Sequence, residues 1–277
     1  MLCDELVSFL KERAADAGEM KVISLKDQRD AEASFGLSVR DVQMTALRCG
    51  ICPSRYVRSV GTFGLDGQLK LLDSCAAVIG CGGLGGWIIE ILARAGVGRM
   101  ILIDGDTFEE NNLNRQLYST EKNMGKSKAY AAAERVRDIN SAVDVTFFEA
   151  FANEENMEDM VSSADVVIDA LDNNRDRRTA AAICGRLGIP FVHGAVGGMY
   201  GETALLHGGE RLMWSAEGTP DKGEETVVGT PPFMPPFIAS VEAREAIGLL
   251  AGIGTLPEKV MLWFDLENFT LGKVKLG

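Results

Sequence analysis

A glycine-rich segment from Gly80 to Gly85 (GCGGLG) is the part of the chain best suited to bind a phosphate-bearing ligand. It follows the apolar run 76–79 and precedes a helical stretch at 87–95, so we expect it to join a strand to a helix. Glycines allow a tight turn there and let a ligand approach the backbone N–H groups at a helix N-terminus. We therefore predict a nucleotide site built on Gly80, Gly82, Gly83 and Gly85.

An acidic residue supports this prediction. Asp104 ends the apolar run 100–104, about twenty residues after the glycines, where a carboxylate can accept hydrogen bonds from ribose hydroxyls. Asp106 follows two residues later. The glycines and the acid would also suit an NAD-dependent oxidoreductase, because many dinucleotide-binding proteins share both features.

Two separated cations and a carboxamide favour a different chemistry. Asn112 and Arg115 follow the acid, and Lys128 stands at the start of a helical run. Cleavage between the α and β phosphates of a nucleotide develops negative charge that Arg, Lys and a divalent cation stabilise. Asp172, just past the apolar run 166–169, is placed to hold Mg²⁺ at the carboxyl end of a strand.

The elements that must position these residues alternate between strand and helix. Short apolar runs at 76–79, 100–104, 144–148, 166–169 and 191–193 alternate with helical stretches at 87–95, 125–139, 153–163 and 174–187. After Gly201 the pattern changes to hairpin-like strands at 202–207 and 260–275, with a Gly/Pro-rich loop from Ser215 to Pro236 and a helix at 237–251. This order predicts an α/β fold with a doubly wound, Rossmann-like, mostly parallel sheet and C-terminal antiparallel strands.

The first fifty residues differ from the rest. They are polar and helical in pattern, and Ser38 is suited to cap the second of two short helices. We predict a small helical extension at 1–52 and one larger α/β domain at 53–277. A helix-turn-helix for DNA is a poor alternative, because the segment carries at least as many acids as bases.

Composition narrows the partners. With 28 Lys and Arg against 40 Asp and Glu, the formal charge is -12, which repels nucleic acid and anionic lipid. We find no signal peptide and no apolar run long enough to span a membrane, so we expect a cytoplasmic protein with reduced cysteines. His193 and His207 lie beside apolar runs and are expected to satisfy local hydrogen bonds.

From about Arg55 onward the chain resembles the MoeB/ThiF/HesA family, relatives of the ubiquitin-activating enzymes. The resemblance rests on Arg55 to Arg58, the glycine segment, Asp104 to Asp106, Asn112 to Arg115, Gly125 to Lys128, Asp172-Asn173 with Arg177, and the stretch Gly229 to Gly252 with its proline-rich start.

The resemblance implies an activity. The chain would use ATP to adenylate the C-terminal glycine carboxylate of a ubiquitin-like sulfur-carrier protein ending in Gly-Gly, in molybdopterin, thiamin or related biosynthesis. Asp104 would bind ribose, and Asp172 would bind Mg²⁺. Asn112, Arg115 and Lys128 would hold the phosphates, and Arg58 would reach the site of a neighbouring subunit in a homodimer.

The cysteines depart from the family pattern. Many members carry two CxxC pairs that bind zinc in the C-terminal half, but this chain has no cysteine after Cys184. The single pair Cys49 and Cys52 has no second pair nearby, so we expect no zinc. The loop 215–230, where thioester-forming relatives place a cysteine, also has none. We predict an enzyme that stops at the acyl-adenylate and depends on a separate sulfur donor, with no fused sulfur-transfer domain.

Three alternatives stay open at this point. One is the NAD-dependent oxidoreductase, and another is a carrier-binding scaffold without catalysis. The third is adenylation of a peptide or of a modified tRNA base, which the acidic charge disfavours.

Overall fold

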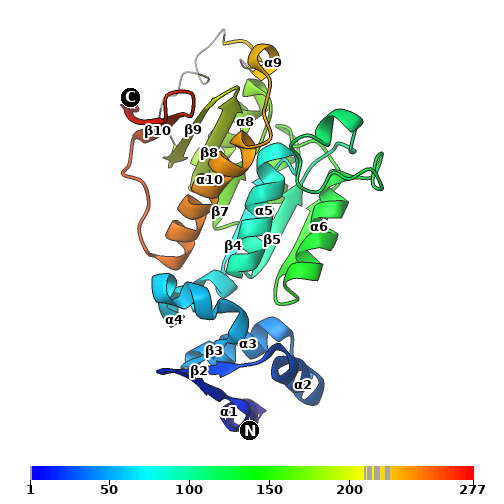
Figure 1. Ribbon diagram of the computed structural model, residues 1–277, viewed down its shortest axis with the longest axis vertical. Helices are drawn as coiled ribbons and strands as arrows, with labels where there is room; N and C mark the ends of the chain where they lie inside the picture. The colour runs from blue at the N-terminus through cyan, green and yellow to red at the C-terminus, as the bar shows by residue number, and fades with distance from the viewer. Residues whose placement is uncertain (1, 209, 211–213, 215–218, 222–224) are drawn as a thin grey trace.

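The computed structural model describes residues 2–208, 210, 214, 219–221 and 225–277 (Figure 1). Its centre is an eight-stranded sheet in the order β11-β10-β9-β8-β7-β4-β5-β6. The strands are β4 (Cys75–Ile79), β5 (Arg99–Ile103), β6 (Asp144–Phe148), β7 (Val166–Asp169), β8 (Phe191–Gly197), β9 (Tyr200–Leu206), β10 (Val260–Asp265) and β11 (Thr270–Lys275). Strands β4 to β8 pair in parallel, and β9 to β11 pair in antiparallel fashion. The predicted fold class is confirmed.

Helices cover both faces of the parallel part, as short continuous apolar strands require. One face carries α5 (Gly83–Ala95), α6 (Lys128–Ile139) and α10 (Met234–Ala251), and the other carries α7 (Met157–Val161) and α8 (Asn174–Leu187) (Figure 1). Two separate apolar clusters fill the two interlayer spaces. Among the described helices, none is long and apolar enough to cross a membrane.

Several element boundaries differ from expectation, and three of them bear on the site. Helix α5 begins at Gly83, inside the glycine segment, and β5 ends at Ile103, which leaves Asp104 as the first residue beyond the strand. Helix α10 begins at Met234, because prolines are tolerated in the first turn of a helix. The loop predicted from Ser215 to Pro236 lies partly outside the described residues, and its described part includes α9 (Glu225–Val228).

The N-terminal extension is not wholly helical. It contains α1 (Leu2–Arg13), α2 (Leu25–Phe35) and α3 (Val39–Arg48), together with a three-stranded sheet of β1 (Ala15–Ala17), β2 (Met20–Ile23) and β3 (Ile51–Pro53). These strands have three or four residues, too few for an alternating pattern to stand out in the sequence. The Ser38 prediction is confirmed, because its side chain accepts a hydrogen bond from the backbone N–H of Asp41.

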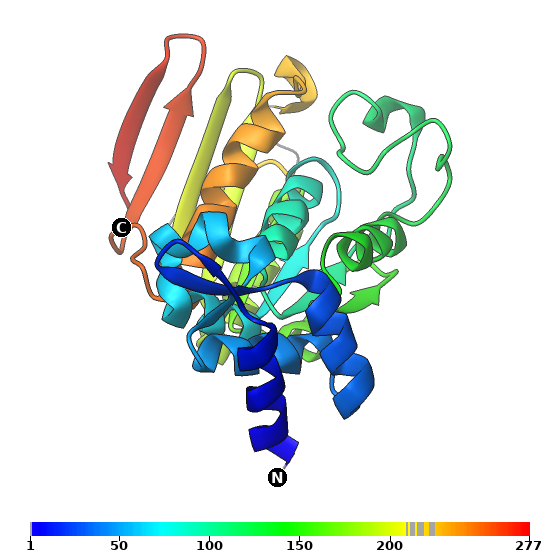
Figure 2. The ribbon, with the colours of Figure 1, turned by 60° about the horizontal axis from the view of Figure 1, so that its bottom comes forward.

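The extension lies at the edge of the main sheet where the parallel strands begin, which is the bottom of Figure 1 and the front of Figure 2. It continues through η1 (Ser54–Tyr56) into α4 (Val57–Asp73), which leads to β4. The buried Tyr56 hydroxyl donates to Gln43 at 3.1 Å and accepts from Asn140 at 3.0 Å, so one side chain joins the extension to the region after α6.

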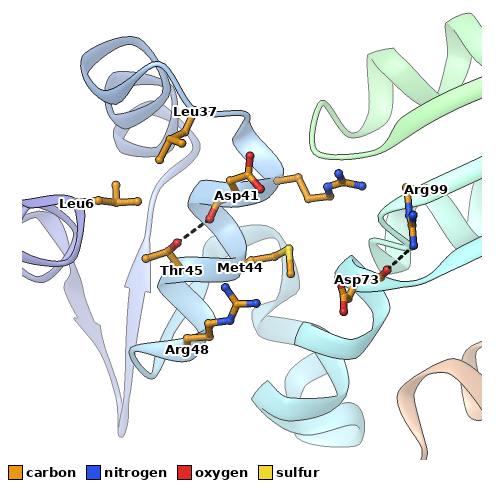
Figure 3. A pocket seen from close by; sticks show the side chains of 9 residues that line it. Leu6, Leu37, Asp41, Met44, Thr45, Arg48, Asp73 and Arg99 are labelled. Carbon is orange, nitrogen blue, oxygen red and sulfur yellow. Dashed lines mark hydrogen bonds between the residues drawn. The ribbon is translucent and has the colours of Figure 1, made fainter. Parts of the chain in front are cut away.

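A surface cleft of about 570 Å³ lies between the extension and the main domain (Figure 3). Leu6 and Met44 come from the extension, and Asp73 and Arg99 come from the main domain. Three arginines and two aspartates line the cleft, and Arg40 is paired with Asp144 at 3.0 Å. The lining therefore carries no strong excess of one charge.

Candidate active site

The glycine segment lies at the carboxyl ends of two central parallel strands. Strand β4 has β5 on one side and β7 on the other, so the strand order reverses here, where ligands of open α/β sheets bind. Gly80 has a φ of +99°, and a Cβ on it would lie 2.4 Å from the carbonyl oxygen of Ala170. A Cβ on Gly85 would lie 1.8 Å from the carbonyl oxygen of Gly80. Both glycines are therefore required for close approach of the segment to β7 and of α5 to β4.

Asp104 is tied to this segment. Its carboxylate accepts from the backbone N–H of Cys81 at 2.7 Å and from that of Asp106 at 2.8 Å. Burial raises the pKa of Asp104 above its ordinary value of 3.8, against the effect of these two bonds. The structure thus places the predicted ribose-binding acid directly against the glycine segment.

Lys128 lies beside the same acidic segment. Ser127 caps α6 by accepting from the backbone N–H of Tyr130, and Lys128 is the first residue of that helix. The Lys128 ammonium is buried and bonds Asp106 at 3.0 Å. Because Asp106 is exposed, this pair can open to a phosphate without breaking the fold.

Arg115 lies next to the glycines. Its Cγ is 4.0 Å from the position a Cβ on Gly83 would take, and its guanidinium donates to Asn111 and Asn114 within its own turn. Asn112, at the end of η2 (Glu110–Asn112), is buried, and its side-chain oxygen accepts from the backbone N–H of Glu109 at 3.0 Å. In this arrangement Asn112 shapes the turn that presents Arg115.

Two residues at the candidate site, Gln116 and Phe151, were not predicted from the sequence. Gln116 is buried over Gly82, and its side-chain oxygen has no hydrogen-bond partner among the described residues. The ring of Phe151, which is 64% exposed, covers Gly105 beside Asp104. Gln116 follows Arg115 directly, which was a usable signal, whereas a lone phenylalanine after a strand gives none.

Asp172 lies beyond the carboxyl end of β7 and is exposed. The backbone on its N-terminal side is fixed, because Leu171 donates to Asp169 at 3.0 Å and accepts from Arg177 at 2.7 Å. Asn173 caps α8 by accepting from the backbone N–H of Asp176. Asp172 therefore stands on a turn whose flanking residues are hydrogen-bonded, at the edge of the sheet where ligands of such folds bind.

Among the described residues, no group of three or more His, Cys, Asp or Glu could hold a metal ion alone. A single carboxylate still fits Mg²⁺, which is commonly held by one or two carboxylates together with substrate phosphates and water. The donor set around Asp172 is of this kind.

Arg58 does not join the site within one chain. It is exposed on α4, below the edge where the parallel strands begin, whereas the glycine segment lies at the opposite edge (Figure 1).

Three of the buried thiols are poorly suited to nucleophilic attack. Burial raises the pKa of Cys52 to about 11 and that of Cys184 to about 12, and it raises the pKa of Cys81 well above its ordinary range. With their pKa values raised this far, these three side chains remain neutral near pH 7. Because a thiol reacts as its thiolate, none of the three is an activated nucleophile.

The fold and the site together define a nucleotide-binding α/β protein with cations and a carboxylate around a glycine loop. The chain belongs to the ThiF family, whose model matches residues 54–277. It is 34% identical to the SAMP-activating enzyme E1 of Haloferax volcanii, over 79% of this chain and 84% of that protein. It is 33% identical to the sulfur carrier protein ThiS adenylyltransferase of Escherichia coli, over 76% and 86%. The adenylyltransferase MOCS3 of Arabidopsis thaliana is 33% identical, but this chain covers only 57% of its length.

Solved structures agree on the fold. The Escherichia coli MccB complex with AMPCPP and MccA has a TM-score of 0.71 at 18% identity, covering 91% of this chain and 79% of that one. Another match, Escherichia coli tRNA N6-threonylcarbamoyladenosine dehydratase, is 36% identical with a TM-score of 0.51, but covers only 52% of this chain and 61% of that one. The predicted family and the enzyme class, adenylyltransferase, are confirmed.

Proposed function

We propose that this enzyme adenylates the C-terminal glycine carboxylate of a ubiquitin-like sulfur-carrier protein and releases pyrophosphate. The proposal is supported by Arg115 beside Gly83, Lys128 paired with Asp106, and Asp172 just past β7, in a chain of the ThiF family. Two of its relatives are named for the activation of SAMP and ThiS, which supports a carrier of this class.

The reaction needs no general base. A carrier carboxylate, already ionised near neutral pH, attacks the α-phosphorus, forming an acyl–phosphate bond while the bond to the β-phosphate oxygen breaks. Arg115 and Lys128 stabilise the negative charge that develops, and Asp104 holds the ribose. Because Asp106 is exposed, Lys128 can exchange its bond to Asp106 for a charge-assisted bond to an arriving phosphate.

Asp172 would hold Mg²⁺ against the phosphates. The ion would neutralise charge on the leaving pyrophosphate. Phe151 extends the nucleotide site, since its exposed ring beside Asp104 is available to stack on the base.

We further propose that the enzyme stops at the acyl-adenylate and that a separate donor supplies sulfur. The raised pKa values of Cys52, Cys81 and Cys184 support this, as does the lack of cysteine between 215 and 230. Incubation with carrier and ATP should leave no DTT-sensitive enzyme–carrier adduct, and isolation of such an adduct would refute this part.

A homodimer completes the proposal. The position of Arg58 on α4, remote from the site of its own chain, supports a role in the site of a second subunit. A cytoplasmic location remains a prediction.

The similarity to the tRNA dehydratase favours one second candidate, adenylation of a modified tRNA base. The acidic composition counts against it, since a tRNA-binding surface is normally basic.

ATP–pyrophosphate exchange tests the proposal. Exchange should require Mg²⁺ and a carrier ending in Gly-Gly, and Asp172→Ala or Arg115→Ala should reduce it at least about a hundredfold, the effect of removing a transition-state contact. Exchange that depends on tRNA instead would support the second candidate, and no exchange with either substrate would refute adenylation.

A further inference from the structure

A group of buried charges lies behind the turn that carries Asp172. It consists of Asp169, Arg177, His193 and Glu202, which come from β7, α8, β8 and β9. The first three are at most 7% exposed. We call these four residues the buried charge network. Burying ions costs free energy that pairing only partly returns, so such a network is often retained for a precise arrangement rather than for stability.

Asp169 is the centre of the network. One of its oxygens accepts from the backbone N–H of Leu171 at 3.0 Å. The other lies 2.7 Å from Arg177 Nε and 2.8 Å from His193 Nδ1. Arg177 then donates to the carbonyl oxygen of Leu171, so both backbone groups next to Asp172 depend on the orientation of Asp169 and Arg177.

His193 connects Asp169 to Glu202. Its Nε2 lies 3.1 Å from Glu202 Oε1, and its ring is fully buried. Burial alone would lower the pKa of His193, but the bonds to Asp169 and Glu202 outweigh it, and the pKa is raised. Each ring nitrogen of His193 therefore faces a carboxylate.

Trp214 closes the other side of His193. The two ring centres are 4.9 Å apart, and the Arg177 guanidinium lies 5.6 Å from the indole ring. The indole nitrogen donates a hydrogen bond to His193 Nε2 at 2.9 Å, so Nε2 faces both Trp214 and Glu202. The imidazole is therefore held from three sides.

We propose that His193 and Glu202 are positioning residues, which fix Asp169 and through it the backbone that carries Asp172. This inference rests on the proposed function of Asp172, but its first test does not require turnover. It assigns a role to two strand residues that contact neither nucleotide nor carrier.

Amide hydrogen exchange gives that first test. The two ring nitrogens can be separated by substitution, because Asn can reproduce the Nδ1 bond to Asp169 whereas Gln reaches toward Glu202. His193→Gln should therefore speed exchange in the segment 170–174, and His193→Asn should restore much of the protection. Exchange in β4 should stay unchanged in both, and His207→Gln, at the other and exposed histidine, should match wild type throughout.

Kinetics give the second test. Loss of a residue that orients a metal ligand typically costs roughly 10–100-fold in activity or metal affinity. His193→Gln should lower kcat and raise the half-saturating Mg²⁺ concentration by factors in this range, while KM for ATP, set at the glycine segment, stays near wild type. Glu202→Gln, whose side chain is 18% exposed and can lose its charge without opening the core, should change the same two quantities in the same direction.

Two results would overturn the inference. One is unchanged exchange at 170–174 in both His193→Gln and Glu202→Gln. The other is equal acceleration throughout the core, which would mean that His193 only supports folding. Absence of adenylation by wild type would instead refute the proposed function, and the hydrogen-exchange result would still decide the role of His193.

Discussion

The side chains of the candidate site divide into those that adjoin the glycine segment and those that shape its surroundings. Asp104, Arg115 and Lys128 adjoin the glycine segment, whereas Asn112 bonds within its own turn. All four were predicted from residue type and order. Their different geometry could not be, because the sequence does not say which polar groups bond locally.

Phe151 offers a test of the nucleotide site that removes no charge. Base–aromatic stacking contributes roughly 1–3 kcal/mol, so Phe151→Ala should raise the half-saturating ATP concentration about tenfold. Phe269→Ala is a matched control, because Phe269 is 87% exposed and lies beyond β10. The half-saturating ATP concentration can be measured by calorimetric titration. Equal values for wild type and Phe151→Ala would exclude stacking.

Element geometry is tightly constrained at the glycine segment. A methyl group on Gly85 would overlap the carbonyl of Gly80, so Gly85→Ala must move α5 away from β4. We expect a loss of about 1–3 kcal/mol in the free energy of unfolding, the usual range for overpacking, together with loss of ATP binding. In urea unfolding, Gly272→Ala on β11 should be nearly neutral, because its methyl group meets only ordinary contacts. Full ATP binding by Gly85→Ala would show that this close approach is dispensable.

The longer elements were predictable because each has a strong local pattern. Helix α8 and strands β6 and β7 match the predicted limits 174–187, 144–148 and 166–169. The small N-terminal sheet was missed because its strands are too short for any period. The buried charge network was missed because its members, up to 33 residues apart in sequence, meet only after the strands pair.

For the molecule as a whole, the raised pKa of His193 leads us to predict how the free energy of unfolding changes with pH. Asp169, Arg177 and Glu202 face it from β7, α8 and β9, and the buried Glu242 of α10 lies across the sheet. The pKa of His193 in the folded protein is raised above its ordinary value of 6.5. The contribution of His193 to folding stability is therefore complete below pH 6.5 and is lost as the pH rises through the folded-state pKa. The free energy of unfolding, measured in urea, should fall more for wild type than for His193→Gln as the pH rises above 6.5. Parallel pH curves would contradict this.

The proposed homodimer predicts complementation between inactive variants. In the proposed dimer, Arg58 acts in the site of the neighbouring subunit, and Asp172 acts in the site of its own subunit. Arg58→Ala therefore damages the neighbour's site, whereas Asp172→Ala damages its own. After subunit exchange, a mixed two-fold dimer contains one intact site, so equal mixing should restore about one quarter of wild-type activity. No recovery, despite mixed dimers detected by native mass spectrometry, would place Arg58 outside the site.

The most direct test of the account is the intact mass of the carrier after incubation with enzyme, ATP and Mg²⁺. We predict a carrier that has gained AMP through its C-terminal carboxylate, with an equal amount of pyrophosphate released. The same carrier lacking its last glycine should gain nothing. A carrier of unchanged mass under conditions in which the enzyme consumes ATP, or AMP on an acceptor other than the carrier, would contradict it.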